Sequence, residues 1–390
     1  MPLKPNDILQ QLNAKQAQFA DFDQRTLKLL QTYQAALVEL SQRDPVALQK
    51  AIERLPSYCG AIPLEPLTQS DRGIIRENLQ WNNREESLAW AKAQIAGVAT
   101  FAVDGSQIFP SKDISLLVAL VQIGWYENLH VETGIYSKDI QTEIMTPADL
   151  SVGDRRELID RKVNMKRFGM ETERLVRYME ERQGCDRCLV FFDGALAASF
   201  AELLDDESRQ FYVNQLTQLL RTSQRCQVPL VGYVDTSYGR DLTAMLRHLA
   251  HLPEAGALRD AQIVNRLMQD RWGDRTPLYR CDSSILKYYC EQHDQVTFTY
   301  LKSTLDGFPA RLELPRWIYE TGRLDQVLNW VRAEVVIGGG YPYAIETADQ
   351  TAVLQARDRQ IFYRILQTWT ETNGLNLRLS RKMVSKARRR

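Results

Sequence analysis

The order of apolar and polar positions predicts helices at the start of the chain. Residues 7–55 carry apolar side chains at helical spacing, as at Leu27, Leu30 and Leu37, with a break at Pro45. We predict two helices here, whose apolar stripe packs against the rest of the chain or against a second copy. A DNA-contacting arm is the alternative interpretation of the same segment.

Extended segments follow these helices. Residues 56–66 contain a glycine and several prolines and predict a connecting segment. Apolar runs near residues 97–103, 114–125 and 130–142 then predict three strands. Because the connections between these runs are short, we expect an antiparallel meander.

Helical and extended patterns alternate after the meander. They predict a helix at residues 154–183, a strand at 188–192, a helix at 207–225 and a strand at 229–234. The resulting order of elements is typical of a ribonuclease-H-like fold. We predict an α/β fold, with a ribonuclease-H-like mixed sheet flanked by helices and an N-terminal helical extension. Further along, we predict a helix at 240–252, strands at 296–301 and 310–317, and one terminal helix at 343–372.

Composition and charge restrict the class of protein. Hydrophobic residues make up 44% of the chain and charged residues 25%, and the formal net charge is +0, so any DNA-binding surface must be local. We expect no secretory signal and no membrane span, because the longest apolar run, residues 114–126, is shorter than the roughly 20 residues that cross a bilayer. A cytoplasmic protein with reduced cysteines is therefore expected. Our predicted domains are an N-terminal helical region and linker at 1–90, a catalytic domain at 91–375 and a basic tail at 376–390.

Two aspartates stand at the ends of apolar strands. Asp104 follows residues 98–103 and precedes Gly105, and Asp193 follows residues 189–192 in the same way. Ligands in α/β sheets commonly bind at the carboxyl ends of strands. Neighbouring strands lie about 4.8 Å apart, so these carboxylates can share a divalent cation.

A third acid comes from the helix between these strands. Glu171 falls on the apolar stripe of that helix, between Phe168 and Leu175, whereas Glu173 lies off it. A carboxylate that faces the core needs a partner, and either a metal ion or an arginine such as Arg167 supplies one.

The fourth acid has two candidates. Asp349 lies on the inner face of the terminal helix, and Asp235 closes the strand at residues 229–234. Each acid alone is as well explained by a helix cap or a salt bridge, but together they favour a metal site. Two ions about 3.5–4 Å apart would suit phosphodiester hydrolysis.

Weaker signals concern nucleic-acid contacts and cysteines. Residues 378–390 hold seven basic residues and no acid, which predicts phosphate contacts or a solubilising tail. Tyr238 and Arg240 follow a strand end and are candidate contacts to a base and a phosphate, with a surface loop as the alternative. Cys185 and Cys188 have metal-like spacing, but a lone pair does not make a zinc site.

Several of these motifs together resemble the NurA nuclease family, in matching order over residues 95–370. The resemblance rests on Val103-Asp104-Gly105-Ser106, on Glu171, on Phe192-Asp193-Gly194-Ala195-Leu196, on Gly340-Tyr341-Pro342 leading to Asp349, and on the strand that ends at Asp235. In this resemblance Asp104, Glu171 and Asp193 match the family's catalytic and metal-binding acids. Asp349 stands where many members have histidine.

The resemblance implies a Mn²⁺-dependent deoxyribonuclease, with Mg²⁺ as the alternative, that holds two ions. It further implies 5′-to-3′ exonuclease and single-strand endonuclease activity in resection of DNA breaks, a homodimer, and a hexameric HerA-type ATPase as partner. Arg388, Arg389 and Arg390 would contact the DNA backbone. The alternative is a NurA-like scaffold that binds DNA or an ATPase and has lost catalysis through the change at Asp349.

Overall fold

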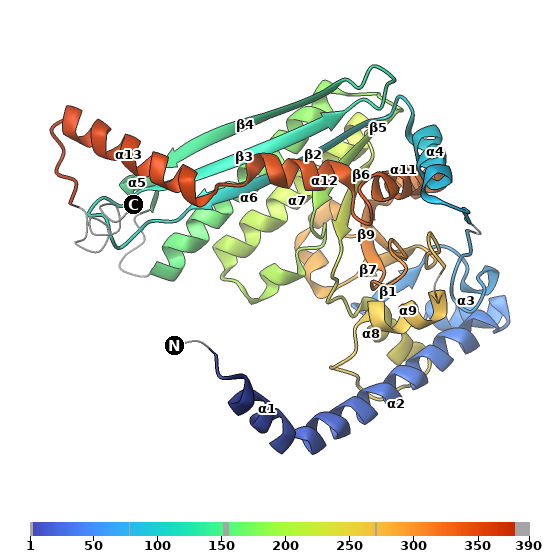
Figure 1. Cartoon of the computed structure of the whole chain (residues 1–390). Coiled ribbons are helices and arrows are strands. Elements are labelled where there is room, and N and C mark those ends of the chain that lie inside the picture. The colour runs from blue at the N-terminus through green and yellow to red at the C-terminus, as the bar shows by residue number, and fades with distance from the viewer. Residues whose placement is uncertain (1–2, 78, 151–155, 270, 379–390) are drawn as a thin grey trace. The chain divides into compact units, whose positions relative to one another are not determined.

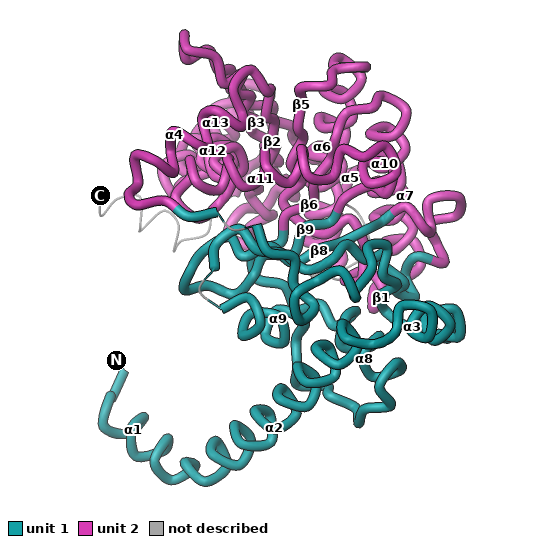
Figure 2. Tube along the Cα trace, turned by 90° about the vertical axis from the view of Figure 1, so that its right-hand side faces the viewer, with its two compact units in different colours: residues 1–80, 234–286, 296–313 teal, residues 81–233, 287–295, 314–390 magenta. Residues whose placement is uncertain are grey.

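The computed structural model describes residues 3–77, 79–150, 156–269 and 271–378. The chain divides into two compact units, which Figure 2 shows in different colours. Unit 1 comprises residues 1–80, 234–286 and 296–313. Unit 2 comprises residues 81–233, 287–295 and 314–390.

Unit 2 is built on a mixed sheet. Its strands are β2 (Ala99–Ile108), β3 (Ala119–Asn128), β4 (Tyr136–Met145), β5 (Cys188–Asp193) and most of β6 (Leu230–Val234). Their order is β6-β5-β2-β3-β4. β2, β3 and β4 are antiparallel neighbours, whereas β2, β5 and β6 run parallel. The predicted meander is confirmed, although β3 and β4 begin later than expected.

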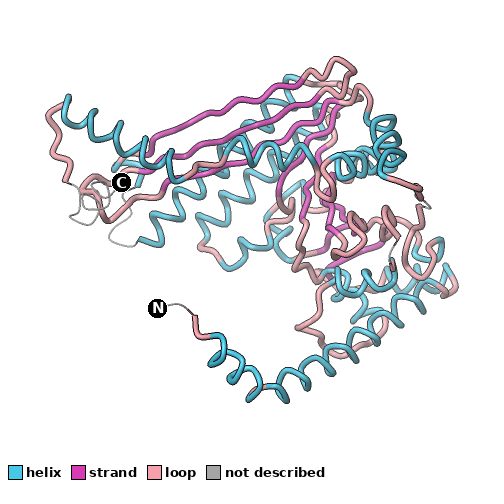
Figure 3. Tube along the Cα trace, in the orientation of Figure 1, coloured by secondary structure: helices cyan, strands magenta, loops and turns pink. Residues whose placement is uncertain are grey.

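Helices cover this sheet on both faces, as Figures 1 and 3 show. They are α4 (Arg84–Ile95), α5 (Pro147–Leu150), α6 (Arg156–Glu181), α7 (Asp206–Cys226), α10 (Trp317–Glu320), α11 (Leu324–Ile337), α12 (Tyr343–Ala352) and α13 (Ala356–Thr372). The long helices α6 and α7 agree with the prediction from the apolar periodicity.

The sheet separates α6 from α12. On one face, the ring of Phe101 in β2 stacks on Tyr178 of α6, with centroids 3.9 Å apart. On the other face, a Cβ at Gly124 of β3 would lie 2.6 Å from the backbone nitrogen of Ala352 in α12. Gly124 is the register partner of Asp104, and side chains alternate along a strand, so Asp104 and Phe101 point to opposite faces.

The prediction of one terminal helix at 343–372 is wrong. Residues 353–355 separate α12 from α13, and the backbone at Gln355 is extended. The Gln355 N–H donates to Asp358 Oδ2 at 2.8 Å, which starts a new helix. The break could not be predicted from the apolar periodicity, because the periodic pattern continues on both sides of residues 353–355.

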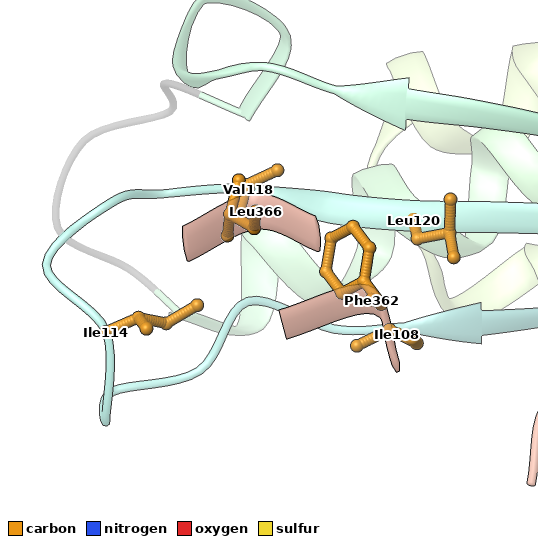
Figure 4. Close-up of a cluster of buried hydrophobic side chains, with 6 residues drawn as sticks. All are labelled: Ile108, Ile114, Val118, Leu120, Phe362 and Leu366. Atoms are coloured by element: carbon orange, nitrogen blue, oxygen red, sulfur yellow. The ribbon is translucent and has the colours of Figure 1, made fainter. Parts of the chain in front are cut away.

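The break directs α13 onto the far end of the β2–β3 hairpin. Phe362 and Leu366 of α13 belong to one buried cluster with Ile108 and Leu120, which are register partners on β2 and β3. Figure 4 shows Phe362 and Leu366 beside these two strands, together with Ile114 and Val118 of the connecting loop. This packing fixes the position of α13 on the sheet.

Unit 1 contains strands and helices from three separate parts of the chain. The elements are α1 (Pro5–Ala14), α2 (Gln16–Ser41), α3 (Pro45–Ile52), β1 (Gly60–Pro63), α8 (Asp241–Leu249), α9 (Asp260–Met268), β7 (Tyr279–Asp282), β8 (Val296–Leu301) and β9 (Ala310–Pro315), of which residues 310–313 belong here. The strand order is β1-β7-β8-β9. The prediction of a mere connection at 56–66 is wrong, because β1 pairs antiparallel with β7.

The N-terminal helices are partly buried. The predicted break at Pro45 is confirmed, and a further break at Lys15 separates α1 from α2. Tyr33 and Leu37 of α2 are buried, and the Tyr33 hydroxyl donates to the Pro253 carbonyl at 2.6 Å. Helix α2 therefore packs within unit 1 through its second half. No helix in the described part of the chain has the length and apolar character needed to span a membrane.

The cysteines differ from the expected reduced state at one place. Cys185 and Cys188 form a disulfide at the turn before β5, with Cα atoms 5.8 Å apart. The turn at residues 186–187 brings the two side chains together. Cys59, Cys226 and Cys281 are free and buried, and Cys290 is free and exposed.

Candidate active site

Asp104 and Asp193 lie side by side in unit 2. Val103 and Phe192 are register partners in the parallel pair of β2 and β5, so the next residue on each strand is an aspartate. β5 ends at Asp193, whereas β2 continues to Ile108 in its pairing with β3. Asp104 is therefore not at a strand end, as the sequence suggested, but lies where its pairing with β5 stops.

Glu171 reaches this place from α6. Its side chain is buried, with 7% of the residue exposed, and its Oε1 accepts from Arg167 at 2.8 Å. The same guanidinium lies 4.0 Å from Asp104 Oδ1. Glu173, two residues further along, is exposed and faces elsewhere. The sequence offered a metal or an arginine as the partner of Glu171, and the side chain of Arg167 occupies that position here.

Gly105 is required by the close approach of α6. A Cβ at this position would lie 2.3 Å from Glu171 Oε1 and 2.7 Å from Arg167 Cγ. No side chain fits in that space without displacing the Glu171–Arg167 pair. Because the residue after Asp104 is glycine, the side chain of Glu171 has room beside β2.

Asp349 comes from the opposite face of the sheet. Helix α12 carries it, and its side chain hydrogen-bonds to that of Asp104. The helix end is held by the Leu354 N–H, which donates to Ser106 Oγ at 3.2 Å. Asp104 is therefore hydrogen-bonded to Asp349, and its charge also acts on Glu171 of α6.

Burial and nearby negative charge favour protonation of Asp104 and Glu171. Burial raises the pKa of Asp104 from its ordinary 3.8 to about 6, and the hydrogen bond that its protonated carboxyl donates to Asp349 and the negative charge of Asp193 add to the rise. Burial likewise raises the pKa of Glu171 to about 8, against the opposing effect of Arg167. Such a group of carboxylates is stabilised by any cation that replaces the shared protons.

The acids open into a cavity of about 540 Å³. Asn164 and Arg167 line it together with Asp104, Glu171 and Asp193, and aromatic side chains complete the lining. Cavities that bind small molecules commonly measure about 300–1,000 Å³. The size and the mixed lining suit a nucleotide-sized ligand.

Tyr341 is a site residue that the sequence reasoning did not identify. Its hydroxyl donates to Asp193 Oδ1 at 3.2 Å, and its ring packs edge-on against Tyr233, with centroids 5.2 Å apart. The glycine run before it makes a tight turn, in which a Cβ at Gly338 would lie 1.9 Å from the Tyr341 carbonyl oxygen. The Gly-Tyr-Pro motif was the signal that could have pointed to it.

A family model matches this arrangement from β2 to the end of α12. The NurA domain model covers residues 98–354, which is more than half of the chain. The chain belongs to the NurA family. This confirms the resemblance that the Asp-Gly and Tyr-Pro motifs indicated.

Solved structures of NurA proteins and of an endonuclease V match the chain. The NurA nuclease from Sulfolobus solfataricus matches with a TM-score of 0.53 and 13% identity, covering 96% of this chain and 98% of its own. A NurA with manganese matches at 0.41 and 11% identity, covering 76% and 94%. The catalytic domain of human endonuclease V matches at 0.34 and 13%, covering 76% and 92%. No curated protein matches the sequence.

The predicted fold class is confirmed by the sheet order and by the Sulfolobus NurA structure. The mixed sheet, the flanking helices and the N-terminal helical region are all present. The acids of this NurA chain therefore lie at a ribonuclease-H-like sheet. Asp104 is on β2 and Asp193 is on β5. The likeness at 13% identity concerns the fold, and the chemistry must be argued from the site.

The NurA site suits a divalent cation by its donor set. Oxygen ligands from carboxylates are those that Mn²⁺ and Mg²⁺ prefer. Among the described residues, no three acidic, histidine or cysteine side chains are already grouped as a metal site. Glu171 is paired with Arg167, and its carboxylate is turned toward the guanidinium. A rotation of these two side chains would free Glu171 for a metal.

The remaining predicted residues of this NurA chain belong to unit 1 or fall outside the described residues. Asp235, the competing fourth acid, belongs to unit 1 and accepts from the Thr236 hydroxyl at 3.4 Å. Tyr238 and Arg240 are also in unit 1, where Arg259 lies 3.8 Å from the Tyr238 ring centroid. The Arg240 guanidinium donates to the Gly256 carbonyl at 2.9 Å. Arg388, Arg389 and Arg390 lie outside the described residues.

Proposed function

We propose that this chain is a metal-dependent DNA nuclease. The observation that carries the proposal is the meeting of Asp104, Glu171, Asp193 and Asp349 at one end of β5, in a chain with a NurA domain. Each comes from a different element, and a structural salt bridge would not need four acids in one place. Hydrolysis of a phosphodiester does need them, to hold cations.

Mn²⁺ is the proposed cofactor, as two ions, with Mg²⁺ as the alternative. The family relative solved with manganese supports this choice. Asp104 and Asp193 would hold the ions between them, and Glu171 and Asp349 would complete the ligand set. Bound ions supply a water of lowered pKa and neutralise charge on the phosphate.

The neighbouring side chains have distinct roles in the proposal. Tyr341 orients Asp193 through its hydrogen bond. Arg167 holds Glu171 in the metal-free protein. With Glu171 engaged by a cation, the Arg167 guanidinium would be available to a phosphate, whose two non-bridging oxygens it could bind through two parallel hydrogen bonds.

Cleavage assays test the proposal. End-labelled single- and double-stranded DNA is incubated with the protein in Mn²⁺, Mg²⁺ or EDTA, beside Asp104→Ala and Asp193→Ala. Glu173→Gln is the matched control, because Glu173 is exposed on the same helix as Glu171. We expect Mn²⁺-dependent cleavage that either aspartate substitution abolishes and the control retains.

The finer activity follows from family membership alone. We propose 5′-to-3′ exonuclease and single-strand endonuclease activity in DNA end resection, in the cytoplasm, with a HerA-type hexameric ATPase as partner. The polarity of the labelled products and co-sedimentation with such an ATPase test these points. Absence of cleavage by the wild type, even with the ATPase, would favour the alternative of an inactive scaffold.

The proposed DNA contacts outside the acid site are Tyr238, Arg240 and the basic tail with Arg388, Arg389 and Arg390. The net charge of the chain is +0, so local groups must supply the attraction. Truncation after residue 378 should weaken single-strand binding and make it less dependent on salt. Unchanged binding and salt dependence would assign the tail a solubilising role.

A homodimer is part of the proposal, and β4 supports it. This strand ends the order of strands in unit 2, and its side chains Tyr136, Ile140 and Ile144 are exposed. They share one face because side chains alternate. An open edge with an apolar face is a surface for pairing with another strand.

The sequence of β4 is complementary to itself. Antiparallel pairing centred on Ile140 sets Tyr136 against Ile144, and on the other face it sets Asp139 against Gln141, so no like charges meet. Ile140→Lys should shift the protein to monomers in sedimentation experiments. Gln141→Lys adds the same charge opposite Asp139 and should leave the dimer intact. Dimers of equal stability in both variants would exclude this edge as the interface.

A further inference from the structure

An exposed aromatic ring lies at the cavity that holds the acids. Phe200 belongs to the short 3₁₀ helix Ser199–Leu203, which follows the Asp193-Gly194 motif. The residue is 52% exposed, and it lines the cavity together with Asp104, Glu171 and Asp193. The acid mechanism proposed above makes no use of it.

The ring is held in place by other rings. Tyr212 of α7 packs edge-on against Phe200, with centroids 5.0 Å apart. Phe168 of α6 packs against Tyr212 at 4.9 Å and against Phe192 of β5 at 5.9 Å. A continuous set of edge-to-face contacts therefore links Phe200 to the strand that bears Asp193.

The backbone before Phe200 is also anchored. The Tyr289 hydroxyl donates to the Leu196 carbonyl at 2.8 Å and accepts from the Ala198 N–H at 2.9 Å. These bonds fix the segment between Asp193 and Phe200. The exposed ring thus stands at a set place relative to the acids, as a substrate contact requires.

A single exposed apolar residue is common and needs no explanation by itself. Phe200 differs from its neighbour Leu203, which is 96% exposed and does not line the cavity. The lining of the cavity thus combines an exposed aromatic ring with the acids and the Arg167 guanidinium. These are the groups that a nucleotide recognises, with its flat base and its charged phosphate.

We propose that Phe200 stacks on the base of the nucleotide whose phosphodiester lies at the acids. The inference rests on the proposed nuclease function and names how the substrate is positioned. Stacking on an aromatic ring accepts every base, so Phe200 contributes affinity for single strands without selecting a sequence. Because the contact exists in the ground state, it acts on KM and on binding rather than on kcat.

Binding of DNA tests the inference without cleavage. Anisotropy of a labelled single strand, with Ca²⁺ in place of the catalytic ion, gives Kd for the wild type, Phe200→Ala, Phe200→Leu and Phe200→Trp. Removal of the ring should weaken binding by about 5- to 150-fold. Phe200→Leu keeps apolar bulk without the ring and should behave like Phe200→Ala, whereas Phe200→Trp should bind as the wild type does. Leu203→Ala is the matched control and should have no effect.

A strand with abasic sites separates stacking from a folding defect. Wild type and Phe200→Ala should bind the abasic strand equally, because it offers no base to stack. An equal loss on normal and abasic strands would overturn the inference, as would unchanged binding of the normal strand by Phe200→Ala. In either case, wild-type cleavage would leave the nuclease proposal standing. A wild type that neither binds nor cuts DNA would refute both.

Discussion

The positions of single residues determine whether Asp104, Glu171 and Asp193 of this NurA chain lie close together. Asp104 and Asp193 were predictable because each follows an apolar run, and Glu171 because it interrupts an apolar stripe. Their register, by contrast, follows from strand pairing across some 90 residues of chain.

Asp349 provides a test at the position where many NurA members have histidine. Asp349→Ala removes a carboxylate that could bind the metal next to Asp104, and it should lower Mn²⁺ affinity by about 10- to 100-fold. Asp349→His restores a ligand and should recover most of that affinity. Isothermal titration with Mn²⁺ measures both. If the alanine variant bound Mn²⁺ as tightly as the wild type, Asp349 would have only a structural role.

Substitution of Gly105 provides a second test. Gly105→Ala would place a Cβ 2.3 Å from Glu171 Oε1, so the Glu171–Arg167 pair must move. We expect a loss of about 1–3 kcal/mol in the free energy of unfolding, together with weaker metal binding. Urea denaturation measures the first. Gly256→Ala is the control, because its Cβ would meet only Arg240 Nη1, at 4.0 Å. Equal stability of the two variants would contradict the close approach of α6.

The sequence could not reveal contacts between residues far apart in the chain. Tyr341 and Asp193 are 148 residues apart, and no local pattern links a tyrosine after glycines to an acid on a strand. The break between α12 and α13 was missed for a related reason. Both helices keep an apolar face, but those faces contact different parts of the sheet, and only the packed structure distinguishes them.

A buried ion pair between Glu334 and His130 connects the elements around the site, and the sequence did not indicate it. The Glu334 side chain on α11 accepts from Thr100 Oγ1 of β2 at 2.8 Å and from the Ala344 N–H of α12 at 2.9 Å. It also lies 3.1 Å from His130 Nε2, and the hydrogen bond with Glu334 raises the pKa of His130 against the opposing effect of burial. Glu334 thus fixes the first turn of the helix that carries Asp349.

Removing this carboxylate should loosen α12. Glu334→Leu removes the acceptor of the Thr100 hydroxyl and of the Ala344 N–H, together with the ion-pair partner of His130, and we expect a loss of about 3–5 kcal/mol in unfolding free energy. Hydrogen exchange should show faster opening of α12 than of α6. Glu346→Leu, at an exposed position of α12, is the control. Loss of the carboxylate without any change in stability would mean that Glu334 does not hold the elements together.

For the whole molecule, the buried acids make stability depend on pH and on metal. The folded pKa of Glu171 is about 8, against an ordinary 4.5. Between these values the folded chain binds more protons than the unfolded chain. In EDTA, the contribution of Glu171 to the free energy of unfolding should therefore be greatest below about pH 4.5. It should fall as the pH rises toward 8.

Thermal unfolding of the wild type and Glu171→Gln checks this sign. The difference between their melting temperatures isolates Glu171 from His130 and other groups that titrate in the same range. We expect the variant to gain relative to the wild type as pH rises from about 5 to 8. Mn²⁺ should raise the wild-type melting temperature most at the upper end. A difference that does not vary with pH would show that Glu171 titrates normally.

The cysteine pattern gives this protein a built-in attachment point for a probe. Four of the six cysteines are free, and three of those four are buried. A bulky maleimide dye should therefore label the folded, oxidised chain once, at Cys290. Unfolding should expose four thiols to the reagent, and reduction should expose all six. The native sequence thus provides a defined site for single-molecule fluorescence on unit 2 without any engineered cysteine.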